Sequence, residues 1–157
     1  MGLRDWSRRR EQRVQLTDVD PSPDPPPESP ALLLQIAAEA VILQDEAENL
    51  LAAVGRHEHL GILAPRAGPV VRRFFALREL LPTGYVDPQL ARLSRVLDTV
   101  FYHHAMQVAT ALEFLAVEWR SDRLAAQVGA FGGLGAPAEH LERAYRELRA
   151  RSERLAA

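Results

Sequence analysis

The sequence contains no cysteine and no lysine, so all 19 basic residues are arginines. Without cysteine the chain has no disulfide, no thiolate nucleophile and no thiolate metal ligand. Without lysine it has no residue for a Schiff base and no phosphate-binding lysine of the P-loop type. Arginine in place of lysine is typical of genomes rich in G and C, and we therefore expect a bacterial protein from such a genome.

The chain also lacks long apolar runs and a strong net charge. No stretch approaches the roughly 18 uncharged apolar residues that a membrane-spanning helix needs. Residues 1–7 include charges, but no apolar segment of a signal peptide follows them. We therefore expect a cytoplasmic protein without membrane contact. Because 19 basic residues nearly balance 21 acidic ones, bulk attraction to nucleic acid is not expected.

Residues 1–29 differ in composition from the rest of the chain and are predicted to form a disordered arm. Six prolines lie between Pro21 and Pro30, a density that favours extended polyproline II and cannot nucleate a core. Residues 1–13 hold five arginines against two acids, whereas residues 14–30, the acidic stretch, hold four acids and no base. The chain is thus divided into the arm and a helical domain, residues 30–157.

Apolar residues recur at helical spacing through the helical domain, which predicts an all-α bundle of four or five helices. The first helix is predicted to begin with Ser29 as N-cap and Pro30 at its first position, and to end between Gly55 and Gly61. The connection 61–69 contains two prolines and is predicted to be irregular. A short second helix is expected to follow it, over residues 69–81.

The third segment, residues 89–128, contains no glycine or proline and follows the start signal Asp87-Pro88. We expect one long central helix, with a break near residues 120–122 and a short helix after it. A last helix is predicted over residues 137–155. The first and third helices are expected to be the two long ones and to pack antiparallel.

His103 and His104, at the centre of the long segment, are the first candidate site. Successive helical side chains point about 100° apart, so the two rings cannot bind one metal ion together. His104 falls within the apolar stripe, where a buried imidazole needs a hydrogen-bond partner, and Glu39 or Glu46 is expected to supply it. We interpret His104 as a hydrogen-bonded core residue. A haem or metal ligand and a protonation switch are the alternatives.

No metal or cofactor is assigned from the sequence. The Glu-x-x-His pairs of di-iron bundles are missing after every glutamate of the long segments. The group His57-Glu58-His59 resembles a metal cluster, but it is interpreted as the solvated last turn of the first helix, where a protonated histidine suits the helix dipole.

The basic half of the arm is the second candidate site. A tryptophan stands beside a run of arginines there, and these two residue types are the most enriched at energetically dominant positions of protein interfaces. The predicted partner-binding residues are Trp6, Arg8, Arg9, Arg10 and Arg13. Binding to nucleic acid phosphates and an inert, solvated tail are the alternatives.

These observations favour a non-enzymatic interaction module over an enzyme, because no motif for nucleophilic or acid–base catalysis is found. The module is expected to act as an adaptor or regulatory subunit that binds a protein partner, or a second copy of itself, through the long helix and the arm. A bundle that binds a small ligand, haem or metal around His104 is the first alternative. A nucleic-acid-binding regulator that uses the basic arm is the second.

Overall fold

The computed structural model describes residues 28–56, 58–118 and 133–157, and these residues form four helices. No strand occurs in this part of the chain, so the prediction of an all-α fold is confirmed. The predicted disordered arm (residues 1–27 of it), the break near residues 120–122 and the short helix after it lie outside the described residues. The helices are α1 (Ala31–Gly55), α2 (Leu60–Glu79), α3 (Pro88–Glu118) and α5 (Ala136–Ala156).

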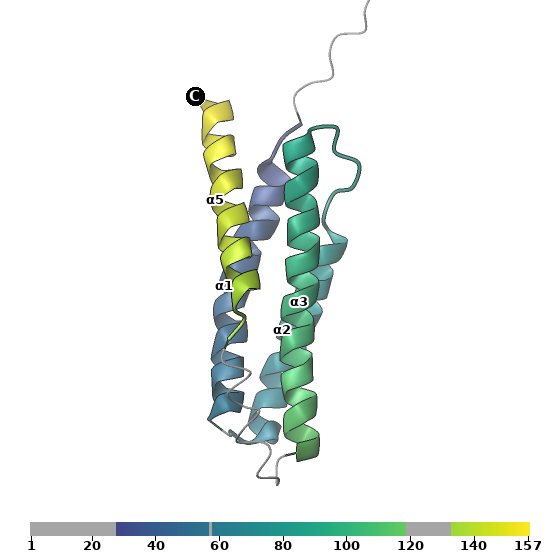
Figure 1. Ribbon diagram of the computed structural model, residues 1–157, viewed down its shortest axis with the longest axis vertical. Coiled ribbons are helices and arrows are strands. Elements are labelled where there is room, and N and C mark those ends of the chain that lie inside the picture. Colours follow the sequence, from purple (N-terminus) through teal and green to yellow (C-terminus); the bar gives the residue numbers. More distant parts are fainter. Residues whose placement is uncertain (1–27, 57, 119–132) are drawn as a thin grey trace, which may run out of the picture.

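The four helices run alternately down and up the long axis of the molecule (Figure 1). The starts of α1 and α3 lie at the same end, where the carboxylate of Glu28 accepts hydrogen bonds from the N–H groups of Val86 and Asp87, each at 3.0 Å. The prediction that the first and third helices are antiparallel is therefore wrong, since α1 and α3 are parallel. The connections from α1 to α2 and from α2 to α3 are short, which makes these neighbours antiparallel, and α2 is a complete leg of the bundle between α1 and α3.

The helix α2 begins at Leu60, so the prediction of an irregular connection over residues 61–69 is also wrong. Two prolines, Pro65 and Pro69, lie inside this helix on its exposed side. Each proline removes one backbone hydrogen bond to the carbonyl four residues earlier. The two carbonyls concerned belong to exposed residues, Gly61 and Pro65, where water can replace the missing donor.

The core consists of side chains from one stripe on each helix. In α2 the buried stripe continues past both exposed prolines, and its residues remain alternately four and three positions apart. Large fully buried side chains come from all four helices and include Leu33, Leu50, Leu63, Phe74, Leu97, Phe101, Leu141 and Leu148. The helix α1 contacts the other three, so α1 and α3 also meet across the bundle.

The helix starts show how local sequence fixes these elements. The hydroxyl of Ser29 accepts a hydrogen bond from the N–H of Ala31 at 3.2 Å, and Pro30 already has helical dihedral angles. The carboxylate of Asp87 accepts bonds from the N–H groups of Gln89 and Leu90 at 2.8 and 3.0 Å. The predicted start of α3 at Asp87-Pro88 is confirmed, whereas α1 begins one residue later than predicted, with Pro30 at the N-cap position.

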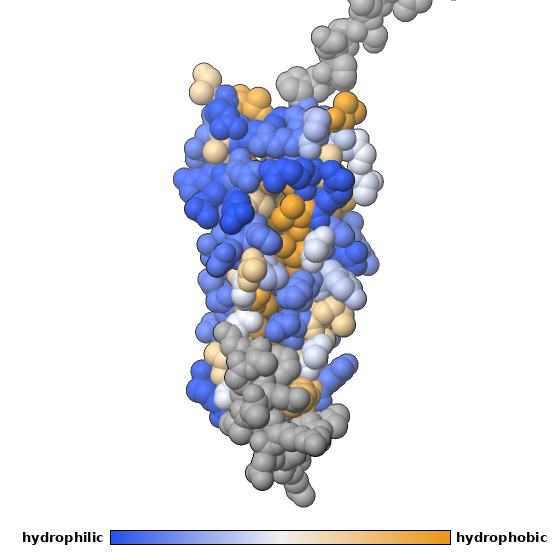
Figure 2. Space-filling model, viewed as in Figure 1, coloured by the Kyte–Doolittle hydropathy of each residue, from blue (hydrophilic) through white to orange (hydrophobic). Residues whose placement is uncertain are grey.

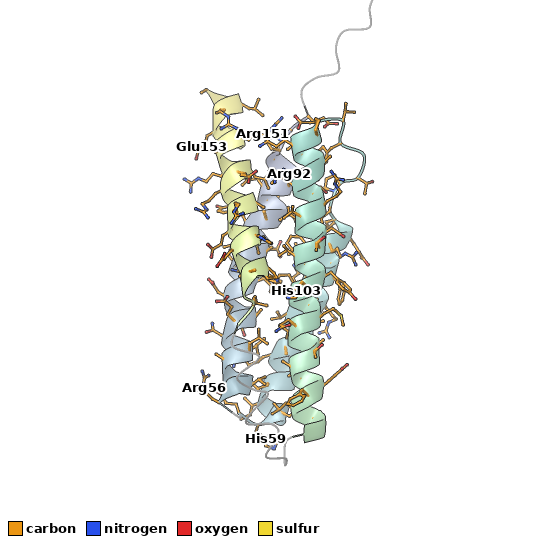
Figure 3. All side chains as sticks on the ribbon, viewed as in Figure 1. Arg56, His59, Arg92, His103, Arg151 and Glu153 are labelled. Carbon is orange, nitrogen blue, oxygen red and sulfur yellow. The ribbon has the colours of Figure 1, made fainter. Side chains whose placement is uncertain are left out.

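An ion pair closes the end of the bundle at which α1 and α3 begin. Arg151, near the end of α5, pairs with Asp87 and donates a second hydrogen bond to Gln89 at 2.6 Å. Figure 3 shows Arg151 at this end of α5. The hydrogen bond from the N–H of Leu90 and the guanidinium of Arg151 lower the pKa of the Asp87 carboxyl, which keeps it charged. None of the helices in the described ranges is both long and apolar enough to cross a membrane.

The helical state of residues 60–69 can be tested with two neighbouring substitutions. Leu63 is fully buried, whereas Ile62 is 60% exposed. We expect Leu63→Ala to lower the free energy of unfolding by about 2–5 kcal/mol, because it leaves a cavity in the core. Ile62→Ala should lower it by less than about 1 kcal/mol. Chemical denaturation of both variants measures the difference, and equal effects would contradict a helix that packs on the core here.

Candidate functional site

His104 lies at the centre of the bundle and is completely buried. Its Nε2 atom is 3.0 Å from the Oε1 atom of Gln44 on α1, and this hydrogen bond joins the two parallel helices across the core. The ring of Phe74 approaches the imidazole edge-on, with centroids 5.2 Å apart and the planes at 74°. The sequence-based interpretation as a hydrogen-bonded core residue agrees with this geometry, although the partner is not the predicted one.

Burial makes His104 a poor base. Loss of hydration, and to a smaller extent the neighbouring His103, lower the pKa of His104 from 6.5 to about 4, although the backbone of Val100 acts in the opposite direction. The Nδ1 atom of the ring makes no hydrogen bond of good geometry. The imidazole is therefore neutral at pH 7, and its acceptance of a proton would place a charge in the apolar core.

The prediction that Glu39 or Glu46 binds His104 is wrong. Both glutamates lie on the outer edge between α1 and α2, where Glu39 pairs with Arg73 and Glu46 pairs with Arg66. A carboxylate keeps its hydration at this edge, whereas beside His104 it would lose it. The true partner, Gln44, is neutral, and a neutral amide loses much less free energy on burial than a carboxylate.

The remaining histidines that the sequence singled out do not join His104. His103 lies on the exposed side of α3, at about half its length (Figure 3). His59 precedes α2, and its Nδ1 atom accepts a hydrogen bond from the N–H of Gly61 at 3.1 Å. His59 thus caps the start of a helix, which corrects the interpretation as the last turn of the first one. His57 lies outside the described residues.

The outer surface between α2 and α3 carries a second group of residues, which we name the α2–α3 face: Phe75, Arg78, Asp98, Tyr102 and Met106. Tyr102 is 47% and Met106 is 39% exposed. The rings of Phe75 and Tyr102 meet at 67° with centroids 6.3 Å apart, and the Arg78 guanidinium lies 5.2 Å from the centre of the Tyr102 ring. Asp98 accepts two hydrogen bonds from Arg78, at 2.6 and 3.2 Å. These contacts hold the exposed Tyr102 ring in one orientation.

A pocket of about 310 Å³ adjoins this face toward the start of α3. Arg95, Ser94 and Tyr85 line it together with Arg78 and Asp98, and we name it the Arg95 pocket. The Ser94 hydroxyl donates a hydrogen bond to the Pro82 carbonyl at 3.0 Å, which fixes the loop that forms one wall.

A smaller depression of about 220 Å³ lies between α3 and α5. Figure 2 shows an apolar strip there between charged borders. Its floor includes Leu93 and Ala144, and one border carries Arg92 and Glu147, which pair with each other.

The sequence analysis missed Gln44 and the α2–α3 face. Gln44 could have been found, because it continues the spacing of four and three residues that joins Ala37, Ala40, Ala47 and Leu51 on α1. The α2–α3 face required knowledge of how α2 lies against α3, since Phe75 and Tyr102 are distant in sequence. The predicted arm residues Trp6, Arg8, Arg9, Arg10 and Arg13 lie outside the described residues.

Comparisons with protein-family models, with curated proteins and with solved structures find no match to this chain. Within the described ranges, no group of three or more potential metal ligands of the histidine, cysteine, aspartate or glutamate type occurs. The functional assignment therefore depends on the geometry of the chain itself.

The depressed pKa of His104 predicts a stability that depends on pH. Between pH 6.5 and about 4 the unfolded chain binds a proton at this ring and the folded chain does not. The free energy of unfolding should therefore fall as the pH drops through this window, by up to roughly 3 kcal/mol from this group alone. Urea denaturation from pH 7 to pH 4 measures the fall, and His104→Leu should reduce it. His103→Leu, the same change on the exposed side, should alter the fall much less than His104→Leu does, and an equal slope in all three proteins would contradict the assignment.

The hydrogen bond between Gln44 and His104 can be tested with a double-mutant cycle at pH 7. Each single change to leucine leaves the other polar group buried without its partner, which should cost about 1–3 kcal/mol. The double variant removes both groups, so it should be less destabilised than the sum of the single variants, by roughly 0.5–3 kcal/mol. Strict additivity of the measured unfolding free energies would show that the two side chains do not interact.

Proposed function

We propose that this protein is a non-enzymatic interaction module, an adaptor or regulatory subunit, that binds a protein partner or a second copy of itself through α3 and the arm. The observation that supports this proposal most directly is the exposure of Tyr102 and Met106 on the longest helix, beside the half-buried Phe75. When a partner covers an aromatic ring and a thioether, apolar surface is removed from water, which favours binding. Packing within the bundle does not account for the exposed position of these two side chains.

The composition of the α2–α3 face is that of a protein-binding surface. Tyrosine, methionine, phenylalanine and arginine are enriched at protein interfaces, and tyrosine and arginine dominate their energetics. Arg78 and Phe75 hold Tyr102 in place before a partner arrives, so less conformational entropy is lost on binding. The adjoining Arg95 pocket offers a concave site for one anchoring side chain of the partner.

The interior of the bundle gives less support to the ligand-binding alternative. His104 is hydrogen-bonded to Gln44 among packed side chains. The three surface pockets whose linings are described contain neither His103 nor His104. The nucleic-acid alternative also has little support in the described part of the chain, where seven ion pairs join arginines to acids. Each of these seven arginines would have to give up its acid to bind a phosphate. We therefore favour the binding of a protein partner over the binding of a small ligand or of nucleic acid.

The arm extends the proposed binding surface. Its residues 1–13 combine Trp6 with a net excess of three positive charges. When this segment and the α2–α3 face bind the same partner, the two linked contacts together give a higher affinity than either contact alone. The partner is thus expected to present an apolar surface with acidic residues at its border.

The proposal can be tested by capture of the partner from the cells that make this protein. Substitution of Tyr102 and Met106 by alanine should lower the amount of captured partner at least tenfold, equivalent to about 1.4 kcal/mol, because it removes the central apolar contacts. Quantitative mass spectrometry of the captured proteins measures the ratio to the parent chain, and Trp6→Ala should lower the same protein's recovery.

A matched control uses exposed apolar residues on another part of the surface. Ile42 on α1 and Ile62 on α2 are 73% and 60% exposed, so their double alanine variant removes similar apolar area away from Tyr102. It should capture the partner as well as the parent chain does. Equal loss in both double variants, or recovery of only nucleic acid in a manner abolished by salt, would contradict the proposal.

A further inference from the structure

Glu28 fixes the place at which the arm leaves the bundle. Its carboxylate is held by the N–H groups of Val86 and Asp87, in the loop that forms one wall of the Arg95 pocket. Burial and the negative charge of Glu28 raise the pKa of Tyr85, another residue of this wall. Glu28, the last acid of the acidic stretch, is therefore held beside the Arg95 pocket.

The Arg95 pocket has one positive charge that the described residues do not neutralise. Asp98 pairs with Arg78, so these two charges compensate each other. Arg95 donates a hydrogen bond from Nε to the Ala91 carbonyl at 3.3 Å, and none of the acids in the described ranges pairs with it. An anionic group that approaches this pocket would meet a partly exposed guanidinium, to which a carboxylate binds in bidentate fashion.

We propose that the acidic stretch of the same chain binds along the Arg95 pocket and the α2–α3 face, with Asp24 on Arg95 and Val19 over Tyr102 and Met106. The stretch supplies both features that this surface lacks, since it carries Asp18, Asp20 and Asp24, no base, and the apolar residues Val14, Leu16 and Val19. This inference deepens the proposed function and depends on it for its meaning, because the same face would bind the partner.

The lengths of the two elements agree. Asp24 precedes Glu28 by four residues, or about 12 Å in the polyproline II conformation that the prolines favour. Arg95 follows Asp87 by eight residues, or about 12 Å along a helix. By the same measure an extended segment from Val19 to Glu28 would span about 28 Å, and Tyr102 and Met106 lie about 22 and 28 Å beyond Asp87 along the helix. One extended path along α3 therefore brings the acid to the cation and the valine to the exposed ring and thioether.

A contact within one chain needs little intrinsic affinity. A short tether gives the acidic stretch an effective concentration on the order of millimolar at the face, so even a weak site is substantially occupied. A partner must then displace the stretch before it reaches Tyr102. The arm would thus have two roles: its basic half recruits the partner, and its acidic half competes with the partner for the α2–α3 face.

The absence of native cysteine allows a direct test on the full chain without any partner. A nitroxide label on Ser22→Cys, six residues before Glu28, should strongly broaden the amide resonances of Thr99 and Tyr102 on α3. Amides at the opposite end of the bundle, such as those of Val54 on α1 and Leu63 on α2, are the internal control and should keep their intensity. Weak, uniform broadening over all four helices would overturn the proposal.

Charge reversal separates this contact from chance encounters. In the labelled chain, Arg95→Glu should strongly reduce the broadening at Thr99 and Tyr102, because the exposed arginine becomes an acid that repels Asp24. Adding Asp24→Arg should restore it. Broadening that persists after Arg95→Glu would overturn the assignment of Arg95. Since no partner is present, the result is independent of whether the partner-capture experiment succeeds.

Discussion

The structure depends on the burial of one apolar stripe from each helix along a common axis. Side chains spaced three and four residues apart on α1, α2, α3 and α5 fill the space between the helices, and the largest of them are almost completely excluded from water. Burial of this kind contributes about 25 cal/mol per Å² of apolar surface and is the main favourable term in folding. The residues on which the proposed function depends lie instead on the outside of the bundle.

Within this core the hydrogen bond between Gln44 and His104 sets the relation of α1 to α3. Two polar side chains in an apolar stripe lower stability in any arrangement that separates them, so they favour the one register in which they meet. The same logic explains the choice of glutamine. A glutamate at position 44 would be charged at pH 7 and would need a protonated His104, whereas burial of the imidazole disfavours the protonated form.

Much of the fold could be predicted from local sequence, because each helix start and each apolar stripe is encoded by neighbouring residues. Asp87, Ser29 and the buried position of His104 are examples. The predictions failed where two principles competed. Proline tends to break helices, yet α2 continues through Pro65 and Pro69. Burial of the continuous stripe from Leu63 to Leu77 contributes more free energy than the loss of two hydrogen bonds to exposed carbonyls costs.

The predicted second helix was therefore too short at its start, and the predicted antiparallel arrangement of the first and third helices was wrong as well. The partners of Glu39 and Glu46, and the meeting of Phe75 with Tyr102, depend on how α2 lies against its neighbours. No local pattern encodes such contacts between helices.

The proposed role follows from the contrast between a filled interior and an exposed aromatic face on the longest helix. Native mass spectrometry of the full-length protein, purified from its own cells at moderate salt, tests this contrast most directly. The account predicts a complex in which the 17.5 kDa chain is joined to another protein or to a second copy of itself, with no bound small molecule. A single chain that carries a stoichiometric metal ion, haem or other small ligand would contradict it.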